Sequence, residues 1–197
     1  NKEVIDYNLL KDIVSRWSSS NKKMVLVGVH APNRISQKWL NSLANDDSIL
    51  VFTETTSNMN HPNFFPSIDK IISPLTSEEM EMLRPDILLT FGGLIVSKKI
   101  KAFLRKFQPK HHWHIDELKA NNTFFCLEHH IKISPNEFFD AIFQQSISPI
   151  ISNYKPMWNA VKRHRSEKHD SFLRSVPFSD LKVFDIIIKE LPQGIIL

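Results

Sequence analysis

An α/β fold with a three-layer, Rossmann-like parallel sheet is predicted by two features of this sequence. The first is a series of short apolar runs, rich in β-branched residues and without alternation, which are typical of strands buried on both faces. The second is the three- to four-residue spacing of apolar positions in the segments between these runs, which predicts amphipathic helices. Strands that alternate with helices form parallel sheets with helices on both faces.

The first elements are a helix, a buried strand and a second helix. Apolar residues four apart form the first helix face, namely Ile5, Leu9, Ile13 and Trp17, and the serines at 18–20 end it. The run KKMVLVGV at 22–29 is the first predicted strand. The next helical stripe runs from Ile35 to Leu43.

Two further strands are predicted at SILVF (48–52) and DILLTF (86–91). Between them, Thr76 and Glu79 form a capping box that opens a short helix, and this helix stops before Pro85. The sequence therefore predicts another strand–helix–strand unit.

The lysine-rich segment SKKIKAFLRKF (97–107) is predicted as an amphipathic helix because its apolar residues recur at i, i+3, i+4 and i+7. WHID (113–116) is the fourth predicted strand, and residues 131–133 form a fifth. Ser134, followed by a first-turn proline and a capping glutamate, opens a helix that runs through residue 143.

The pattern changes after residue 150. Residues 152–170 are polar and predicted helical. Ser179 caps a last apolar helix, and a turn after this helix leads into the apolar run GIIL. The predicted divisions are a lead-in helix (1–20), a central Rossmann-like domain (21–150), a connector (151–174) and the first elements of a truncated C-terminal domain (175–197). Because the sequence starts at Asn1 without a methionine and stops inside an apolar run, we expect a piece of a longer protein.

The composition, 42% hydrophobic and 23% charged, is that of an ordinary globular protein. The apolar runs are shorter than the roughly 20 residues of a membrane helix, and no signal peptide is evident. A single cysteine, Cys126, cannot form an internal disulfide, which favours a cytoplasmic setting. The net charge of +4 favours anionic partners only weakly.

Conventional nucleotide loops are excluded by the glycine positions. The four glycines stand at 28, 92, 93 and 194, whereas G-x-G-x-x-G needs three glycines within six residues and a P-loop needs G-x-x-x-x-G-K-[ST]. A Rossmann-like fold here would lack the usual phosphate-binding turn.

The best local candidate for a binding site is the stretch after the strand at 86–91. Ligands of open parallel sheets lie beyond the carboxyl ends of strands, and Gly92 and Gly93 lie at such an end, where absent side chains permit close approach to the backbone. Ser97 is predicted to cap the next helix, which places Lys98 in its first turn, where helix N–H groups attract anions. The alternative is a solvated lysine, since Lys99 and its neighbours make this helix face basic anyway.

Other polar residues indicate chemistry less strongly. His112 and His114 share a strand face, but zinc needs three or four convergent ligands, so strand histidines are the preferred interpretation. Glu54 follows the second strand without a partner that would define a mechanism, so a loop carboxylate is expected. Cys126 is expected to be a small buried residue, and the cluster KRHRSEK (162–168) a solvated linker helix rather than a nucleic-acid site.

Four stretches, taken in order, resemble a known enzyme domain: GVHAP, VFTETTSN, RPDILLTFGGLIVSKKIKAFLRKFQP and HHWHIDE. They are similar to the middle domain of the 2-succinyl-5-enolpyruvyl-6-hydroxy-3-cyclohexene-1-carboxylate synthases, a thiamine-diphosphate enzyme family of menaquinone biosynthesis. The closing VPFSDLKVFDIIIKELPQGIIL resembles the entry into that family's C-terminal domain. The resemblance covers nearly the whole chain.

The resemblance implies a function for a longer protein. That protein would be a transferase that decarboxylates 2-oxoglutarate on thiamine diphosphate, with Mg²⁺ or Mn²⁺, and adds the succinyl unit to isochorismate. It would be a homo-oligomer, a dimer or tetramer, with neither nucleic acid nor a membrane as partner. The residues that activate and hold the cofactor belong to the first and third domains, so the resemblance implies no catalytic, cofactor or metal residue here.

For this domain, the resemblance implies scaffolding and one substrate contact. The family lysine that follows the middle-domain strand and reaches toward the substrate pocket corresponds to Lys98, and Ser97, Gly92 and Gly93 would accompany it. The turn GGLIVS is more apolar than a usual pocket wall.

Two alternatives remain open at this point. The first is a central domain of another thiamine-diphosphate enzyme that binds FAD or ADP, against which the scarcity of glycines argues. The second is a non-catalytic regulatory or anion-binding module built around the basic helix, which would bind anionic polymers with a steep salt dependence.

Overall fold

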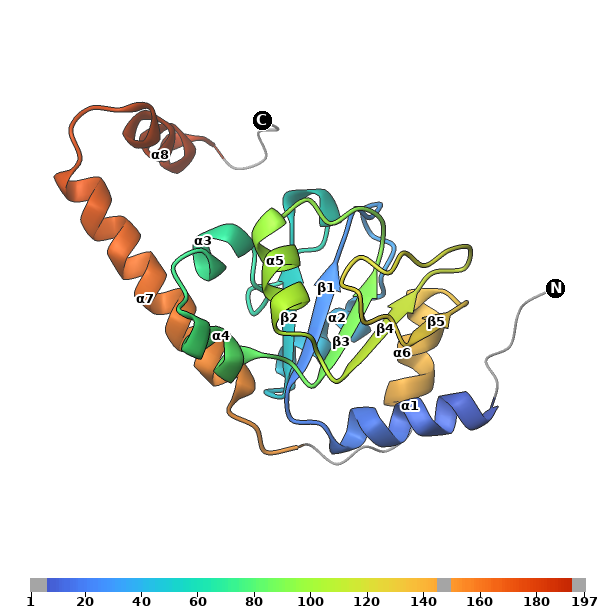
Figure 1. Cartoon of the computed structure of the whole chain (residues 1–197). Helices are drawn as coiled ribbons and strands as arrows, with labels where there is room; N and C mark the ends of the chain where they lie inside the picture. Colours follow the sequence, from blue (N-terminus) through green and yellow to red (C-terminus); the bar gives the residue numbers. More distant parts are fainter. Residues whose placement is uncertain (1–6, 145–149, 193–197) are drawn as a thin grey trace. The chain divides into compact units, whose positions relative to one another are not determined.

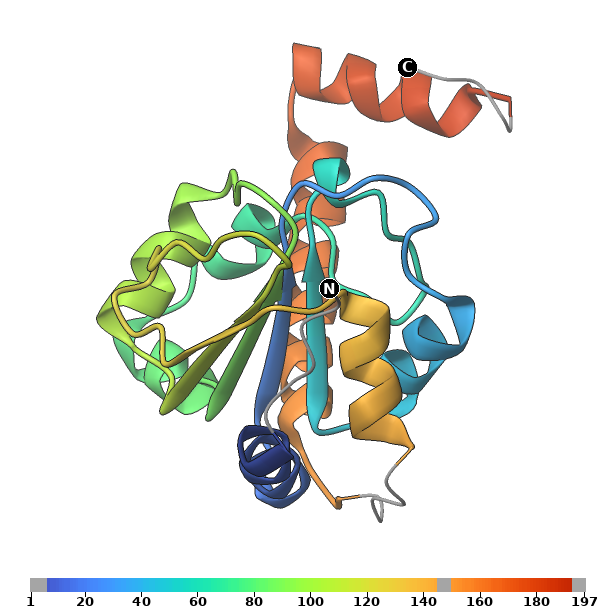
Figure 2. The same ribbon diagram turned by 90° about the vertical axis from the view of Figure 1, so that its right-hand side faces the viewer.

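The computed structural model describes residues 7–144 and 150–192 of the chain. The described strands form one five-stranded, all-parallel sheet in the order β2-β1-β3-β4-β5. Their bounds are β1 Lys23–Val27, β2 Ile49–Thr53, β3 Ile87–Phe91, β4 His111–Ile115 and β5 His129–Ile131. With helices on both faces, as Figures 1 and 2 show, this sheet confirms the predicted three-layer α/β class.

At least one helix separates each pair of successive strands up to β4, as the sequence predicted, but the described segment between β4 and β5 contains no helix. Their bounds are α1 Tyr7–Ser19, α2 Gln37–Asn45, α3 Ile68–Ile72, α4 Ser77–Leu83, α5 Lys98–Lys106, α6 Pro135–Phe143, α7 Tyr154–Ser175 and α8 Asp180–Glu190, with a 3₁₀ turn η1 at Thr55–Ser57. Neither α3 nor η1 was predicted, and β5 lies two residues earlier than expected. The predicted helix residue Ile5 and the terminal GIIL lie outside the described residues.

The sheet is covered by different helices on its two faces (Figure 2). Alternate residues of each strand point to opposite faces, so Val25 and Val27 belong to a core that α1, α2 and α6 share. The other face lies under α3, α4 and α5, and Ile100, Phe103 and Leu104 are the buried residues of α5 there. Every residue of β1, β2 and β3 is buried, as the absence of alternation in their sequences predicted.

The first turns of α7 pack on the face of the sheet that α5 covers. The Trp158 ring is fully buried, and its centroid lies 5.2 Å from that of Phe52 and 6.4 Å from that of Phe103. The Tyr154 hydroxyl donates a hydrogen bond to the Leu83 carbonyl at 3.1 Å. The chain divides into two compact units between Asn159 and Ala160, so the division falls inside a helix that the sequence assigned to a connector.

The second unit comprises the rest of α7 and α8. Ser179 stands at the N-cap position of α8, as predicted, but its side chain makes no capping hydrogen bond. Phe184, Ile187 and Ile188 are exposed within the described residues. None of the described helices has the length and hydropathy that crossing a bilayer requires.

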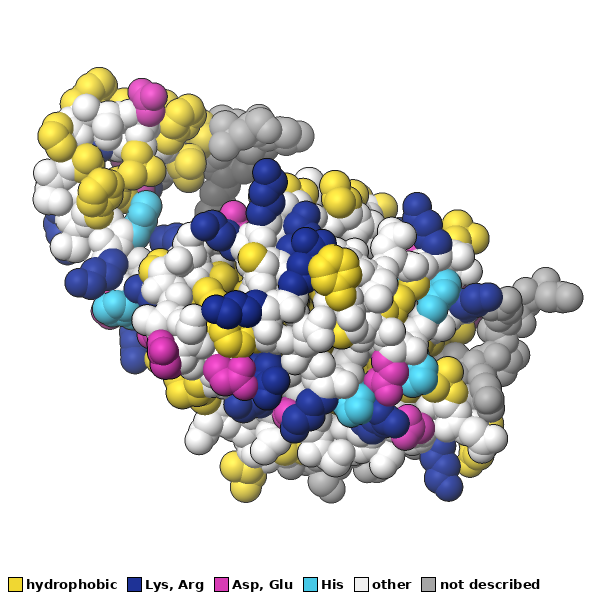
Figure 3. All heavy atoms as spheres, in the orientation of Figure 1, with side chains coloured by type: hydrophobic (Ala, Val, Ile, Leu, Met, Phe, Trp, Pro, Cys, Tyr) yellow, Lys and Arg dark blue, Asp and Glu magenta, His cyan; other side chains and the backbone are white. Residues whose placement is uncertain are grey.

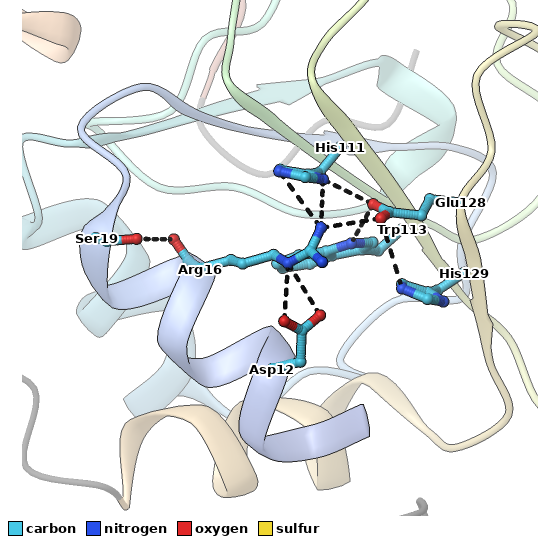
Figure 4. A network of polar contacts seen from close by, with 7 residues as sticks. All are labelled: Asp12, Arg16, Ser19, His111, Trp113, Glu128 and His129. Carbon is cyan, nitrogen blue, oxygen red and sulfur yellow. Dashed lines mark hydrogen bonds and ion pairs between the residues drawn. The ribbon is translucent and has the colours of Figure 1, made fainter. Parts of the chain in front are cut away.

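A polar network fastens α1 to the amino end of β4 (Figure 4). Arg16 forms ion pairs with Asp12 and with Glu128, each at 2.9 Å. Glu128 also accepts from His111 at 2.8 Å and from the Trp113 indole at 3.3 Å. Burial alone would raise the pKa of Glu128, but the hydrogen bond from His111 and the nearby positive charges outweigh it and hold that pKa below its usual value.

Candidate functional site

The loops at the carboxyl ends of β1 and β3 lie against each other. The Gly28 N–H donates to the Phe91 carbonyl at 3.0 Å, and the Gly93 N–H donates to the Val29 carbonyl at 2.7 Å. A Cβ atom at position 28 would lie 2.2 Å from the Gly93 carbonyl oxygen, and Gly92 has a φ of +79°. Close backbone approach therefore requires glycine at 28, and a left-handed turn favours it at 92.

Ser97 is the N-cap of α5, as the sequence predicted. Its hydroxyl oxygen accepts from the Ile100 N–H at 3.1 Å, and its hydroxyl donates to the Asp69 carboxylate. Its own N–H donates to Glu54 at 2.6 Å. With 8% of its surface exposed, Ser97 uses its polar groups to build the start of the helix.

Glu54 has a role that the sequence did not reveal. Its carboxylate accepts the N–H groups of Val96, at 2.8 Å, and Ser97, so it holds the segment that enters α5. The loop that carries it is anchored as well: the Glu54 N–H donates to the Ser57 hydroxyl, and that buried hydroxyl donates to the Val27 carbonyl at 2.7 Å. No sequence spacing links Glu54 to α5, because the contact joins loops that follow different strands.

Lys98 opens α5 on the exposed side of the helix. Among the described residues its side chain has no hydrogen bond or ion pair, and the side chain of Lys99 beside it has none either. In contrast, Lys101 donates to the Ile95 carbonyl at 3.2 Å, and Arg105 to the Thr123 carbonyl at 2.9 Å. Figure 3 shows the basic side chains gathered over α5. The Lys98 ammonium is thus available to an external anion.

A pocket of about 260 Å³ lies beyond the carboxyl ends of β3 and β4. Gly92 and Gly93 line it, together with Lys101 and residues of the segment 116–124, whereas Ser97 and Lys98 are not among its lining residues. The four predicted site residues are therefore neighbours along the chain, but only the two glycines line this pocket.

The floor of this pocket carries the two histidines that share a face of β4. The Thr90 hydroxyl lies between them, 2.9 Å from His112 Nε2 and 2.8 Å from His114 Nδ1. Burial lowers the pKa of His112 to about 3 and lowers that of His114, so both imidazoles are neutral at pH 7. Among the described residues no cluster of three metal-binding side chains occurs.

Cys126 differs from its expected environment, because it is only partly buried. Burial nevertheless raises the pKa of its thiol to about 11. The thiolate that a nucleophile requires is therefore scarce at neutral pH.

Comparison with known proteins identifies relatives over nearly the whole chain. Residues 7–181 match a protein-family model described as the middle domain of thiamine pyrophosphate. The 2-succinyl-5-enolpyruvyl-6-hydroxy-3-cyclohexene-1-carboxylate synthase of Flavobacterium psychrophilum is 44% identical over 98% of this chain and 36% of its own length. Proteins of the same name from Flavobacterium johnsoniae and Christiangramia forsetii are each 44% identical, over 93% and 95% of this chain and 33% of their own lengths.

This chain thus spans about a third of the length of the curated relatives that it matches. The family model covers most of the sheet-forming unit and reaches into α8, so the match and the described fold refer to the same part of the molecule. This chain belongs to the family of thiamine pyrophosphate enzyme middle domains.

Proposed function

We propose that the longer protein containing this domain is a thiamine-diphosphate-dependent transferase of the 2-succinyl-5-enolpyruvyl-6-hydroxy-3-cyclohexene-1-carboxylate synthase type. It would decarboxylate 2-oxoglutarate and add the succinyl unit to isochorismate, using Mg²⁺ or Mn²⁺ with the cofactor, as a cytoplasmic homo-oligomer. The observation that carries this proposal is the 44% identity to synthases of that name over nearly the whole chain.

The part that this domain plays is scaffolding and one electrostatic contact. The chain has no glycine-rich phosphate loop, and the groups that hold the cofactor are proposed to lie in the other domains. When bound, thiamine diphosphate supplies the electron sink for decarboxylation. This domain alone is therefore proposed to be inactive.

Lys98 is the proposed substrate contact. Its exposed ammonium has no partner among the described residues, and isochorismate carries carboxylates that an ammonium attracts. The two glycines belong to the loop that leads to Lys98, and Ser97 shapes the first turn of its helix. We propose these three as supports of the contact rather than as ligands, because the polar groups of Ser97 are engaged inside the fold.

The scarcity of glycines argues against the rival function of a flavin- or nucleotide-binding central domain, because the chain contains neither a G-x-G-x-x-G loop nor a P-loop. A flavin absorption spectrum in the purified protein would favour the rival.

The test is an activity assay on the protein with its flanking domains present. Isochorismate consumption would be followed with 2-oxoglutarate, thiamine diphosphate and Mg²⁺ for the parent and for Lys98→Ala. We expect activity in the parent and a rise of roughly 10- to 100-fold in the isochorismate KM of the variant, which corresponds to the loss of one charge-assisted contact. Lys99→Ala, which removes the adjacent exposed lysine, is the matched control.

The outcomes separate the two parts of this proposal. An inactive parent that is folded and loaded with cofactor would contradict the reaction. An active parent whose isochorismate KM is unchanged by Lys98→Ala would keep the reaction and return Lys98 to a solvated helix face.

A further inference from the structure

Two acidic side chains from distant segments hold the start of α5. Glu54, in the loop after β2, accepts the N–H groups of Val96 and Ser97 at 2.8 and 2.6 Å. Asp69, in α3, accepts the Ser97 hydroxyl. Lys98 is the next residue, so the backbone that leads directly into it is fixed by contacts with both segments.

The carboxylate of Glu54 changes which groups at this helix start can bind an anion. The N–H groups at a helix N-terminus are ordinarily free to bind anions, and the helix dipole favours negative charge there. Here an internal carboxylate already occupies the N–H groups of Val96 and Ser97, and the Ile100 N–H is bound by Ser97. Among the described residues the Lys98 ammonium remains unpartnered, as does that of Lys99.

The loop that carries Glu54 is hydrogen-bonded to the sheet. β1 lies between β2 and β3 in the sheet, so Glu54 links the loop of β2 to the helix that follows β3. Its own N–H is bound to Ser57, and Ser57 is fully buried and bound to Val27 at the end of β1. Hydrogen bonds through Glu54 and Ser57 therefore connect the start of α5 to β1.

We propose that Glu54 is a positioning residue for Lys98: its two hydrogen bonds fix the first turn of α5 and thereby aim the lysine at the substrate carboxylate. This inference rests on the proposed function, since it concerns the same contact. A side chain on an unsupported helix end samples many positions, and a misplacement of about 1 Å at a binding group can reduce catalytic efficiency by roughly 100-fold.

Glu54→Gln is the informative substitution, because the amide has one acceptor oxygen for two N–H groups and no charge. In the protein with all domains present, we expect the isochorismate KM to rise by roughly 5- to 50-fold while kcat changes by less than about twofold. The 2-oxoglutarate KM, which serves as an internal reference, should stay constant. If Glu54→Gln does not fold, the isochorismate KM would be measured for Glu54→Asp instead, which keeps the charge but is one methylene shorter.

Glu79→Gln is the matched control. Glu79 also caps a helix start, because its carboxylate accepts the Thr76 N–H at 2.8 Å at the beginning of α4. No proposed substrate contact lies on α4. For this variant we therefore expect a fall in melting temperature without a change in the isochorismate KM.

The double variant Glu54→Gln/Lys98→Ala separates positioning from general support. If Glu54 acts through Lys98, adding Glu54→Gln to Lys98→Ala should raise the KM by less than about twofold. A full additional effect in that background would overturn the positioning role.

A raised KM in Lys98→Ala together with a parental KM in Glu54→Gln would overturn the Glu54 inference alone. A parental KM in Lys98→Ala would overturn the substrate contact, and with it the role of Glu54. The two failures are thus distinguishable.

Discussion

His112, in β4, has a side chain whose protonation depends on its surroundings. His112 is 1% exposed, and its Nδ1 has no hydrogen-bond partner among the described residues, while its Nε2 lies 2.9 Å from the Thr90 hydroxyl. Burial disfavours the charged imidazolium, which is why the pKa of His112 falls to about 3. The folded state therefore keeps this residue neutral under conditions in which the unfolded chain protonates it.

Acid should destabilise the chain through His112. The unfolded state binds a proton below a pH of about 6.5 and the folded state does not until about 3, so stability falls as the pH falls between these values. The slope is about 1.4 kcal/mol per pH unit, or about 2 kcal/mol between pH 6.5 and 5. His114, whose pKa burial also lowers, contributes in the same direction. Denaturant unfolding at several pH values measures this slope.

His112→Phe should flatten the slope, although it lowers stability at pH 7 because the contact with Thr90 is lost. His164→Phe replaces an exposed histidine of α7 and should leave the slope unchanged. A His112→Phe variant with the parental pH dependence would show that the titration lies elsewhere.

At the scale of elements, the sheet brings together loops that are far apart in sequence. The strands end level, since Val27 of β1 pairs with Thr53 of β2 and with Phe91 of β3. The loops that follow can therefore bind one another, as Glu54 does with the start of α5. Close packing of the loops after β1 and β3 depends on the lack of a side chain at Gly28.

Gly28→Ala should be far more destabilising than Gly93→Ala. The new methyl at 28 would lie 2.2 Å from a backbone oxygen of the neighbouring loop, whereas a methyl at 93 would meet its nearest atoms at 3.5 Å. We expect a loss of about 3 kcal/mol or more for Gly28→Ala and less than about 1 kcal/mol for Gly93→Ala. Equal melting temperatures for the two variants would contradict the close approach.

At the scale of the whole chain, the sheet-forming unit holds its own core. Tyr154 and Trp158 are 1% and 0% exposed and pack on the face of the sheet that α5 covers. They precede the division of the chain into two compact units. The beginning of α7 is thus part of the first unit, and the sequence alone assigned it to a connector.

Truncation should reveal where the first unit ends. A chain that stops after Asn159 keeps both aromatic residues and should unfold cooperatively. A chain that stops after Asn153 loses them and should be less stable by at least about 3 to 5 kcal/mol, the typical loss for removing a buried Trp side chain. Thermal unfolding followed by circular dichroism compares the two, and equal midpoints would contradict this assignment.

The sequence by itself determined the class of fold. Runs such as MVLV and ILLT lack alternation because both sheet faces are covered, and the capping boxes at Thr76 and Ser134 appear where predicted. These signals are local, since a period of apolar residues or a cap involves groups within a few positions of one another. Weak local signals failed: α3 and η1 were not predicted, and β5 was placed two residues late.

The site was only partly contained in the sequence. Order along the chain put Gly92, Gly93, Ser97 and Lys98 beyond one strand, and alternation put His112 and His114 on one face, where Thr90 joins them. The tertiary structure alone decided that Glu54 occupies the start of α5, and that Gly28 must be glycine to admit the Gly93 carbonyl. Both depend on the lateral order of parallel strands, which places the ends of β2, β1 and β3 side by side, and no spacing within one segment carries that information.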